Sequence, residues 1–134
     1  MNRILITCIF FAIGCNPNQD HSTKIINNYH MKPSLIHTVF FWTNEGATEE
    51  QKKAFEEGLI KLGTCPQIQS YFWGPPAPTE AREVVDNTYD YAINVHFASK
   101  EDQDAYQTEP IHQEFIENHK DLWAKVVVYD NVVR

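Results

Sequence analysis

Four segments of the chain are rich in β-branched and aromatic residues, and their order relative to two helical segments constrains the fold more than any other feature. The four segments span residues 35–42, 68–73, 89–97 and 123–130. This composition, with alternation along the segments, predicts β-strands. Helical patterns follow the first and the third strand, whereas a proline-containing polar connection separates the second from the third.

The first helix is indicated by a capping box. Thr48 precedes two glutamates and is followed by Gln51, so the Thr48 side chain can accept from the third helical N–H while Gln51 reaches back. Phe55, Leu59 and Leu62 then recur at spacings of four and three, which places them on one helical face.

The second helix is predicted to be broken. Ser99 with the acids after it is typical of an N-terminus, and Pro110 interrupts the pattern because proline lacks the N–H and crowds the preceding turn. A further short helix is expected over residues 111–119. The whole order predicts an α+β, ferredoxin-like βαββαβ domain, with helices on one face of a four-stranded antiparallel sheet.

Alternation along the strands divides the sheet into two faces. One face is expected to carry His37, Val39, Phe41, Tyr71, Tyr91, Ile93, Val126 and Val128. The other is expected to carry Ile36, Thr38, Phe40, Trp42, Ile68, Ser70, Phe72, Ala92, Asn94, His96, Val127 and Tyr129. Eight of these twelve are apolar or aromatic, whereas a sheet covered on one side normally has a polar second face. A second copy of the chain is the simplest cover, so we expect a homodimer with sheets packed face to face.

The N-terminus has the pattern of an export signal. Arg3 is followed by an apolar run from Ile4 to Ile13, too short to span a bilayer. Residues 12–15, Ala-Ile-Gly-Cys, resemble a bacterial lipobox, which predicts a signal peptide over residues 1–15 and lipidation of Cys15. A signal peptide cut elsewhere and a buried first strand are the alternatives. The expected location is the bacterial cell envelope, with the chain exported and anchored as a membrane lipoprotein.

A polar linker is expected over residues 16–33, a domain over 34–130 and a tail over 131–134. The linker has too little apolar content to bury itself. Without the leader and Cys15, Cys65 is the remaining thiol, so no internal disulfide forms and Cys65 is interpreted as a small buried hydrophobe. The net charge of −7 disfavours a nucleic-acid partner.

Several short motifs, taken in order, resemble the stress-responsive A/B barrel (Dabb) domain family. They are His37 to Phe41 at the start, Trp73-Gly74 after the second strand, Phe97-Ala98-Ser99 leading to Tyr106, Pro110-Ile111-His112, and a last strand ending in Val-Val-Val-Tyr-Asp. The resemblance implies a dimeric α/β barrel. Most members have no assigned reaction, and the understood enzymes are polyketide cyclases of the olivetolic acid type, which perform an aldol condensation without a cofactor.

The cyclase resemblance implies a set of site residues. The base histidine falls on His112, its partner tyrosine on Tyr106 and a second pocket histidine on His37. With the residues of the same sheet face, the expected pocket is lined by Val39, Phe41, Phe55, Tyr71, Tyr91, Ile93, Trp123, Val126 and Val128. Two positions depart from the cyclases: Tyr91 replaces a third pocket histidine and Gly58 replaces a helix tyrosine.

The histidines leave two interpretations open. His112 could act as a base near neutral pH with the Tyr106 hydroxyl as donor, or it could pack at the Pro110 turn and bond to a backbone carbonyl. His37 is similarly either a base or a hydrogen-bonded core residue. No pair of histidines has close helical spacing and no Cys-x-x-Cys occurs, so a zinc site is not expected. The resemblance to the cyclases implies that no cofactor is needed.

The functional expectation is a lipid-anchored homodimer, associated with stress, that binds a small hydrophobic or aromatic molecule. Two alternatives remain: a cofactor-free cyclase or lyase that uses His112 and Tyr106, and a structural dimer without a ligand. Whether the chain is an enzyme is left open. Membrane contact is expected through the lipid anchor only.

Overall fold

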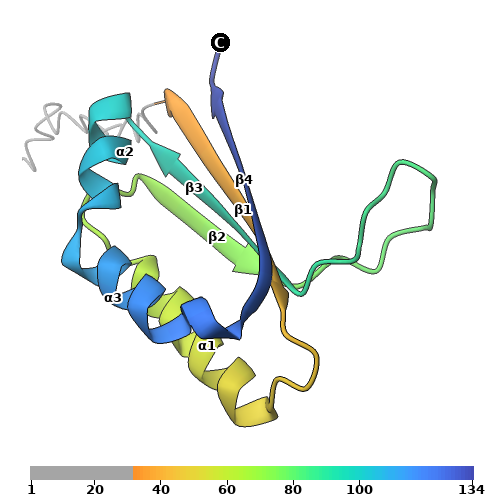
Figure 1. The fold of residues 1–134 in the computed structure, drawn as a ribbon. Coiled ribbons are helices and arrows are strands. Elements are labelled where there is room, and N and C mark those ends of the chain that lie inside the picture. The colour runs from red at the N-terminus through yellow and green to blue at the C-terminus, as the bar shows by residue number, and fades with distance from the viewer. Residues whose placement is uncertain (1–31) are drawn as a thin grey trace, which may run out of the picture.

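The computed structural model describes residues 32–134, so the predicted signal segment, Cys15 and most of the predicted linker lie outside the described residues. The elements, in chain order, are β1 (Leu35–Thr43), α1 (Glu49–Leu62), β2 (Ser70–Gly74), β3 (Tyr91–Phe97), α2 (Lys100–Gln107), α3 (Pro110–His119), a short 3₁₀ turn (Lys120–Leu122) and β4 (Trp123–Val132) (Figure 1). No helix within residues 32–134 combines the length and the apolar character that a membrane span requires.

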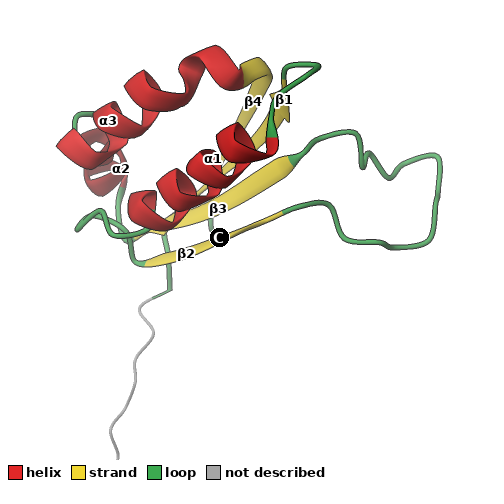
Figure 2. Ribbon diagram, turned by 90° about the horizontal axis from the view of Figure 1, so that it is seen from below, coloured by secondary structure: helices red, strands yellow, loops and turns green. Residues whose placement is uncertain are grey.

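The strands form one antiparallel sheet in the order β2-β3-β1-β4, with β1 in the centre between β3 and β4. All three helices lie on the same side of this sheet (Figure 2). The predicted α+β, ferredoxin-like arrangement with helices on one face is therefore confirmed. The last strand runs to Val132, so two residues of the expected tail belong to the sheet.

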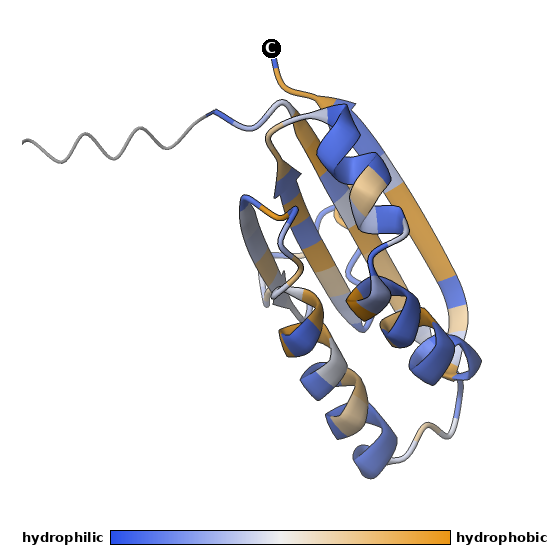
Figure 3. Ribbon diagram, turned by 90° about the vertical axis from the view of Figure 1, so that its left-hand side faces the viewer, coloured by the Kyte–Doolittle hydropathy of each residue, from blue (hydrophilic) through white to orange (hydrophobic). Residues whose placement is uncertain are grey.

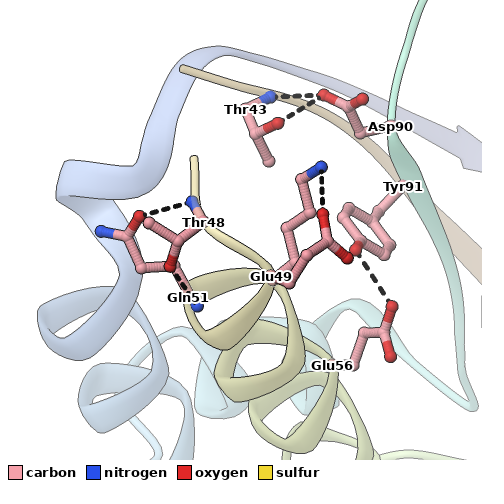
Figure 4. A network of polar contacts seen from close by, with 8 residues as sticks. Thr43, Thr48, Glu49, Gln51, Glu56, Asp90 and Tyr91 are labelled. Carbon is pink, nitrogen blue, oxygen red and sulfur yellow. Dashed lines mark hydrogen bonds and ion pairs between the residues drawn. The ribbon is translucent and has the colours of Figure 1, made fainter. Parts of the chain in front are cut away.

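Local signals fix the helix ends. At the start of α1 the Thr48 side chain accepts from the Gln51 N–H at 3.2 Å and the Gln51 side chain accepts from the Thr48 N–H at 2.9 Å, which completes the predicted capping box (Figure 4). Ser99 caps α2 by accepting from the Asp102 N–H at 3.0 Å. Pro110 is the first residue of α3, where its missing N–H costs no hydrogen bond, so the helix restarts there.

The core lies between the sheet and the helices. Three α1 residues at the predicted spacing, Phe55, Leu59 and Leu62, are at most 1% exposed. They pack on the buried side chains of the central strands, which alternate with half-buried ones along β1 and β3. The outward sides of the helices carry mainly hydrophilic residues, whereas apolar and hydrophilic residues alternate along the strands (Figure 3).

No helix of the described residues 32–134 covers the opposite face of the sheet (Figure 2). Phe72 on β2 is 62% exposed and Tyr129 on β4 is 61% exposed. Phe40 on β1 is half-buried, and its ring contacts Tyr89 and Tyr129 with centroid distances of 4.9 and 6.2 Å. The division into two faces follows the predicted alternation except at Ile68, which was predicted for the second face but precedes β2 and packs against the core. This second face, here called the outer face, leaves large apolar side chains in water.

The connection between β2 and β3 projects away from the rest of the domain as a long loop over residues 75–90 (Figures 1 and 2). Its far part is exposed, with Val84 at 89%. Its end is tied to the sheet by Asp90, whose carboxylate accepts from the Thr43 N–H at 2.6 Å and from the Thr43 hydroxyl at 2.8 Å (Figure 4).

Candidate functional site

A cavity of about 190 Å³ lies between the sheet and the helices. Its floor comes from β1, β3 and β4 and its cover from the α2–α3 segment with one residue of α1. The lining residues are His37, Val39, Phe41, Leu62, Ile93, Tyr106, Gln107, His112, Phe115, Ile116, Trp123, Val126 and Val128. The cavity is therefore mainly apolar, and the lining residues that carry polar side-chain atoms are His37, His112, Gln107, Tyr106 and Trp123. Val126 and Val128 on edge strand β4 are 37% and 47% exposed, so this strand borders the entrance.

One end of the cavity holds a histidine paired with a carboxylate. His37 on β1 is 6% exposed, and its Nδ1 lies 2.6 Å from Oδ1 of Asp130. The two residues meet because they are directly opposite in the β1–β4 register. A carboxylate acceptor places a proton on Nδ1, so Nε2 carries the lone pair when the ring is neutral.

His112 lies close to this pair on the third residue of α3. Its Nδ1 donates to the carbonyl oxygen of Gln107 at 3.3 Å, and its ring stacks on Tyr106 with a centroid distance of 4.3 Å. Burial lowers the pKa of His112 from its ordinary value, and the neighbouring His37 lowers it further, whereas the Gln107 carbonyl raises it. His112 is thus held neutral at physiological pH. Among residues 32–134, Nε2 of neither histidine has a protein partner.

Tyr106 contributes the face of its ring to the cavity. The side chain is fully buried, and its hydroxyl has no hydrogen-bond partner among the described residues. Burial raises the pKa of this hydroxyl, and nearby Cys65 and Tyr71 raise it further. The donor role expected for the Tyr106 hydroxyl therefore lacks access to the cavity in this structure.

The far end of the cavity is aromatic. The rings of Phe41, Phe115 and Trp123 lie within 5.4 to 6.2 Å of one another, centroid to centroid. Phe41 is four residues along β1 from His37, which separates the two ends by about 13 Å. The cavity consequently has a polar end and an aromatic end.

Three predicted pocket residues do not line the cavity. Phe55 is fully buried beneath it, because α1 turns this side chain into the core behind Phe41. Tyr71 lies on β2 at the sheet edge and its ring packs against Gly63. Tyr91 donates its hydroxyl to Glu56 at 3.0 Å (Figure 4), and burial together with this bond raises its pKa to about 12. Alternation along the strands cannot separate Tyr71 and Tyr91 from the true lining, and the position of Phe55 followed from the cyclase resemblance alone.

The structure adds residues that the sequence analysis missed. Four line the cavity, namely Leu62, Gln107, Phe115 and Ile116, and Asp130 holds His37. Phe115 and Ile116 follow His112 by three and four residues, so helical periodicity from His112 was an available signal. Asp130 continues the alternation of Val126 and Val128 on β4, and this could also have been used.

Other candidate chemistry is absent from this site. Cys65 is buried, and burial raises its pKa to about 11, so the thiol is a poor nucleophile. This agrees with its interpretation as a small buried hydrophobe. No group of three or more metal-ligating side chains occurs within residues 32–134. The two interpretations of His112 both find support, because this residue bonds to a backbone carbonyl and also lines the cavity.

Comparison with known proteins identifies the kind of domain. The family model of the Stress responsive A/B Barrel Domain (Dabb) matches residues 35–133. Olivetolic acid cyclase from Cannabis sativa is 24% identical over 102 residues, which are 75% of this chain and 98% of the cyclase.

Solved structures show the same fold. A dimeric ferredoxin-like protein from Thermobifida fusca superposes with a TM-score of 0.65 at 21% identity, covering 80% of this chain and 97% of that one. The hydroxynitrile lyase from Passiflora edulis superposes with a TM-score of 0.64 at 19% identity, covering 77% of this chain and 96% of the lyase. At these identities the likeness concerns the fold.

Proposed function

The chain belongs to the stress-responsive A/B barrel (Dabb) domain family, and within that family we propose that it binds a small aromatic molecule bearing a hydroxyl group in the central cavity. The observation that carries this proposal is the cavity itself, with an aromatic end at Phe41, Phe115 and Trp123 and two histidines at the other end. Ligand sites are typically concave, mainly apolar and fitted with a few polar groups.

The size of the cavity limits the ligand to roughly one ring. Apolar protein cavities of about 150 Å³ take up a benzene-sized molecule. The volume of about 190 Å³ therefore suits one aromatic ring with a short substituent. Because the aromatic rings at the far end are fixed by the core, this space is present before a ligand arrives.

The polar end favours a hydrogen-bond donor. Nδ1 of His37 is engaged by Asp130 and Nδ1 of His112 by the Gln107 carbonyl, so Nε2 is the nitrogen that each ring presents to a ligand, as an acceptor in the neutral form. A phenol or enol hydroxyl can donate a hydrogen bond to such a nitrogen. A ligand without a donor would leave these nitrogens unpaired on desolvation, which disfavours it.

Calorimetric titration with 4-ethylphenol and ethylbenzene tests the proposal. We expect saturable binding of the phenol at one site per chain and weaker binding of ethylbenzene. Val128→Phe fills the entrance and should abolish binding, whereas Val132→Phe, on the same strand but outside the lining, should not. Equal binding by wild type and Val128→Phe would refute the cavity as the site.

The outer face supports a homodimer as part of the proposal. Phe72 and Tyr129 are more than half exposed on a sheet face that no helix within residues 32–134 covers, and a protein of the same fold is described as dimeric. In a dimer with two-fold symmetry, the outer face of each copy would cover the outer face of the other.

We further propose that the chain is exported and anchored by acylation of Cys15. This proposal rests on the lipobox-like residues 12–15 alone. Mass spectrometry of the protein from its own cells tests both points.

A second candidate function is cofactor-free proton transfer. It is favoured by the Asp130-oriented His37 beside a neutral His112, because such nitrogens can accept a proton from a carbon acid. The similarity to a protein named a cyclase and to one named a lyase supports this alternative. The buried Tyr106 hydroxyl leaves the histidines as the acid–base groups.

Deuterium exchange provides an assay that needs no knowledge of the natural substrate. The loss of the α-proton NMR signals of phenylacetone in D₂O should accelerate with wild-type protein and return to the buffer rate in His37→Ala. His96→Ala, a histidine on the outer face, serves as control. If wild-type protein binds 4-ethylphenol but leaves the exchange at the buffer rate, catalysis on such ketones is rejected. Binding then remains as the proposed function.

A further inference from the structure

His119 at the end of α3 rests directly on Gly58 of α1. A Cβ at position 58 would overlap with Nε2 of the His119 imidazole, so the ring can lie here only if residue 58 is glycine. Gly58 has an ordinary helical position within α1, and the overlap concerns the ring rather than the backbone. The space that a helix side chain at 58 would occupy is thus taken by a side chain from the opposite helix.

The same imidazole supports the aromatic end of the cavity from behind. Its centroid lies 5.1 Å from that of Phe115 and 5.4 Å from that of Phe55. Phe115 lines the cavity, whereas His119 does not. His119 therefore forms a second layer behind the cavity wall.

Beyond His119 the structure is loosely filled. A small void of about 40 Å³ between α1 and α3 is lined by Gly58, Phe115 and His119 together with four other residues. His119 also borders an open groove on the far side, with Gln51 and Asp121 among its other walls. Burial lowers the pKa of His119, which keeps the ring neutral in this apolar layer.

We propose that the Gly58–His119 contact sets the depth of the cavity and thereby the length of the substituent that a bound aromatic molecule can carry. This inference rests on the proposed binding function and adds a specificity-determining pair to it. With His119 in place, Phe115 cannot retreat, and the cavity ends at Phe115. Without the imidazole, Phe115 can swing toward Gly58 and the void joins the cavity.

An affinity series with 4-alkylphenols, from methyl to hexyl, measures that depth. Affinity should rise roughly fourfold per methylene while the chain still fits and then fall, which defines a cutoff length. An imidazole occupies roughly the space of two methylene groups. His119→Ala should therefore move the cutoff to chains about one or two carbons longer. Glu117→Ala, an exposed α3 residue that lines neither the cavity nor the void, should leave the cutoff unchanged.

A double-mutant cycle tests the contact without any ligand. Gly58→Ala should lower the melting temperature of the otherwise native protein, because the new methyl group collides with the His119 ring. In the His119→Ala background the same change should raise the melting temperature, because alanine favours helix over glycine and the space is now free. If Gly58→Ala changed the melting temperature in the same direction in both backgrounds, the proposed contact between Gly58 and His119 would be refuted.

The two proposals fail in distinguishable ways. If wild type binds the series but His119→Ala, still folded, keeps the wild-type cutoff, the depth inference is overturned and the binding site stands. If no phenol binds wild type, the proposed ligand class fails, and the crystal structure of His119→Ala decides the inference. A cavity continuous from His37 to Gly58 supports it, and a cavity still closed at Phe115 overturns it.

Discussion

Replacing Phe72 with aspartate should separate the proposed dimer into monomers. Phe72 is 62% exposed on the outer face, and a Phe side chain presents roughly 200 Å², so each copy leaves about 120 Å² to be covered. At about 25 cal/mol per Å² this amounts to roughly 3 kcal/mol per copy. A two-fold symmetric interface contains Phe72 from both copies, so the substitution weakens the free energy of dimerisation by about 6 kcal/mol. This corresponds to an increase of the dissociation constant by about four orders of magnitude.

Sedimentation velocity over a micromolar concentration range measures this change directly. Wild type should sediment as a dimer and Phe72→Asp as a monomer with an unchanged far-UV circular dichroism spectrum. Val84→Asp is the matched control, because Val84 is 89% exposed but lies in the projecting loop between β2 and β3. A wild-type monomer, or a Phe72→Asp dimer of wild-type affinity, would refute the argument from the outer face.

Three further predictions concern stability and are checked by urea denaturation. Thr48→Ala removes the side-chain acceptor of the α1 capping box and should cost about 1 kcal/mol; an unchanged midpoint would contradict the role of the cap. Phe55→Ala empties a fully buried site and should cost about 3–5 kcal/mol, so a loss below 1 kcal/mol would mean that the core tolerates the void. Because burial lowers the pKa values of His112 and His119, the folded state binds fewer protons than the unfolded state. Stability should therefore be complete above pH 6.5 and decline as the pH falls below it, and a rise on acidification would contradict the assignment.

The architecture was accessible from the sequence because its signals are local. The capping box at Thr48, the N-cap at Ser99 and the restart at Pro110 each depend on residues within one turn of the helix they begin. The two sheet faces follow from the period of two along a strand, which needs no knowledge of the partner strand. The histidine positions followed from the family resemblance, and the structure places His37 and His112 at the same cavity.

The details of the site depend on contacts that span the chain. The pairing of His37 with Asp130 requires the β1–β4 register, across 93 residues of sequence. The burial of the Tyr106 hydroxyl depends on how the α2–α3 segment packs on the sheet, and alternation along the strands does not predict it. The contact of His119 with Gly58 joins two helices, and a glycine in a helical pattern does not by itself indicate which side chain will occupy its space.

The proposed binding site is tested most directly by imidazole NMR during titration with 4-ethylphenol. Two-bond ¹H–¹⁵N correlation spectra report each ring separately and reveal which nitrogen accepts a hydrogen bond. We expect saturable shifts of Nε2 in His37 and His112, with His96 on the outer face unchanged. Unchanged His37 and His112 signals at saturating phenol, or shifts confined to His96, would contradict a ligand site between the sheet and the helices.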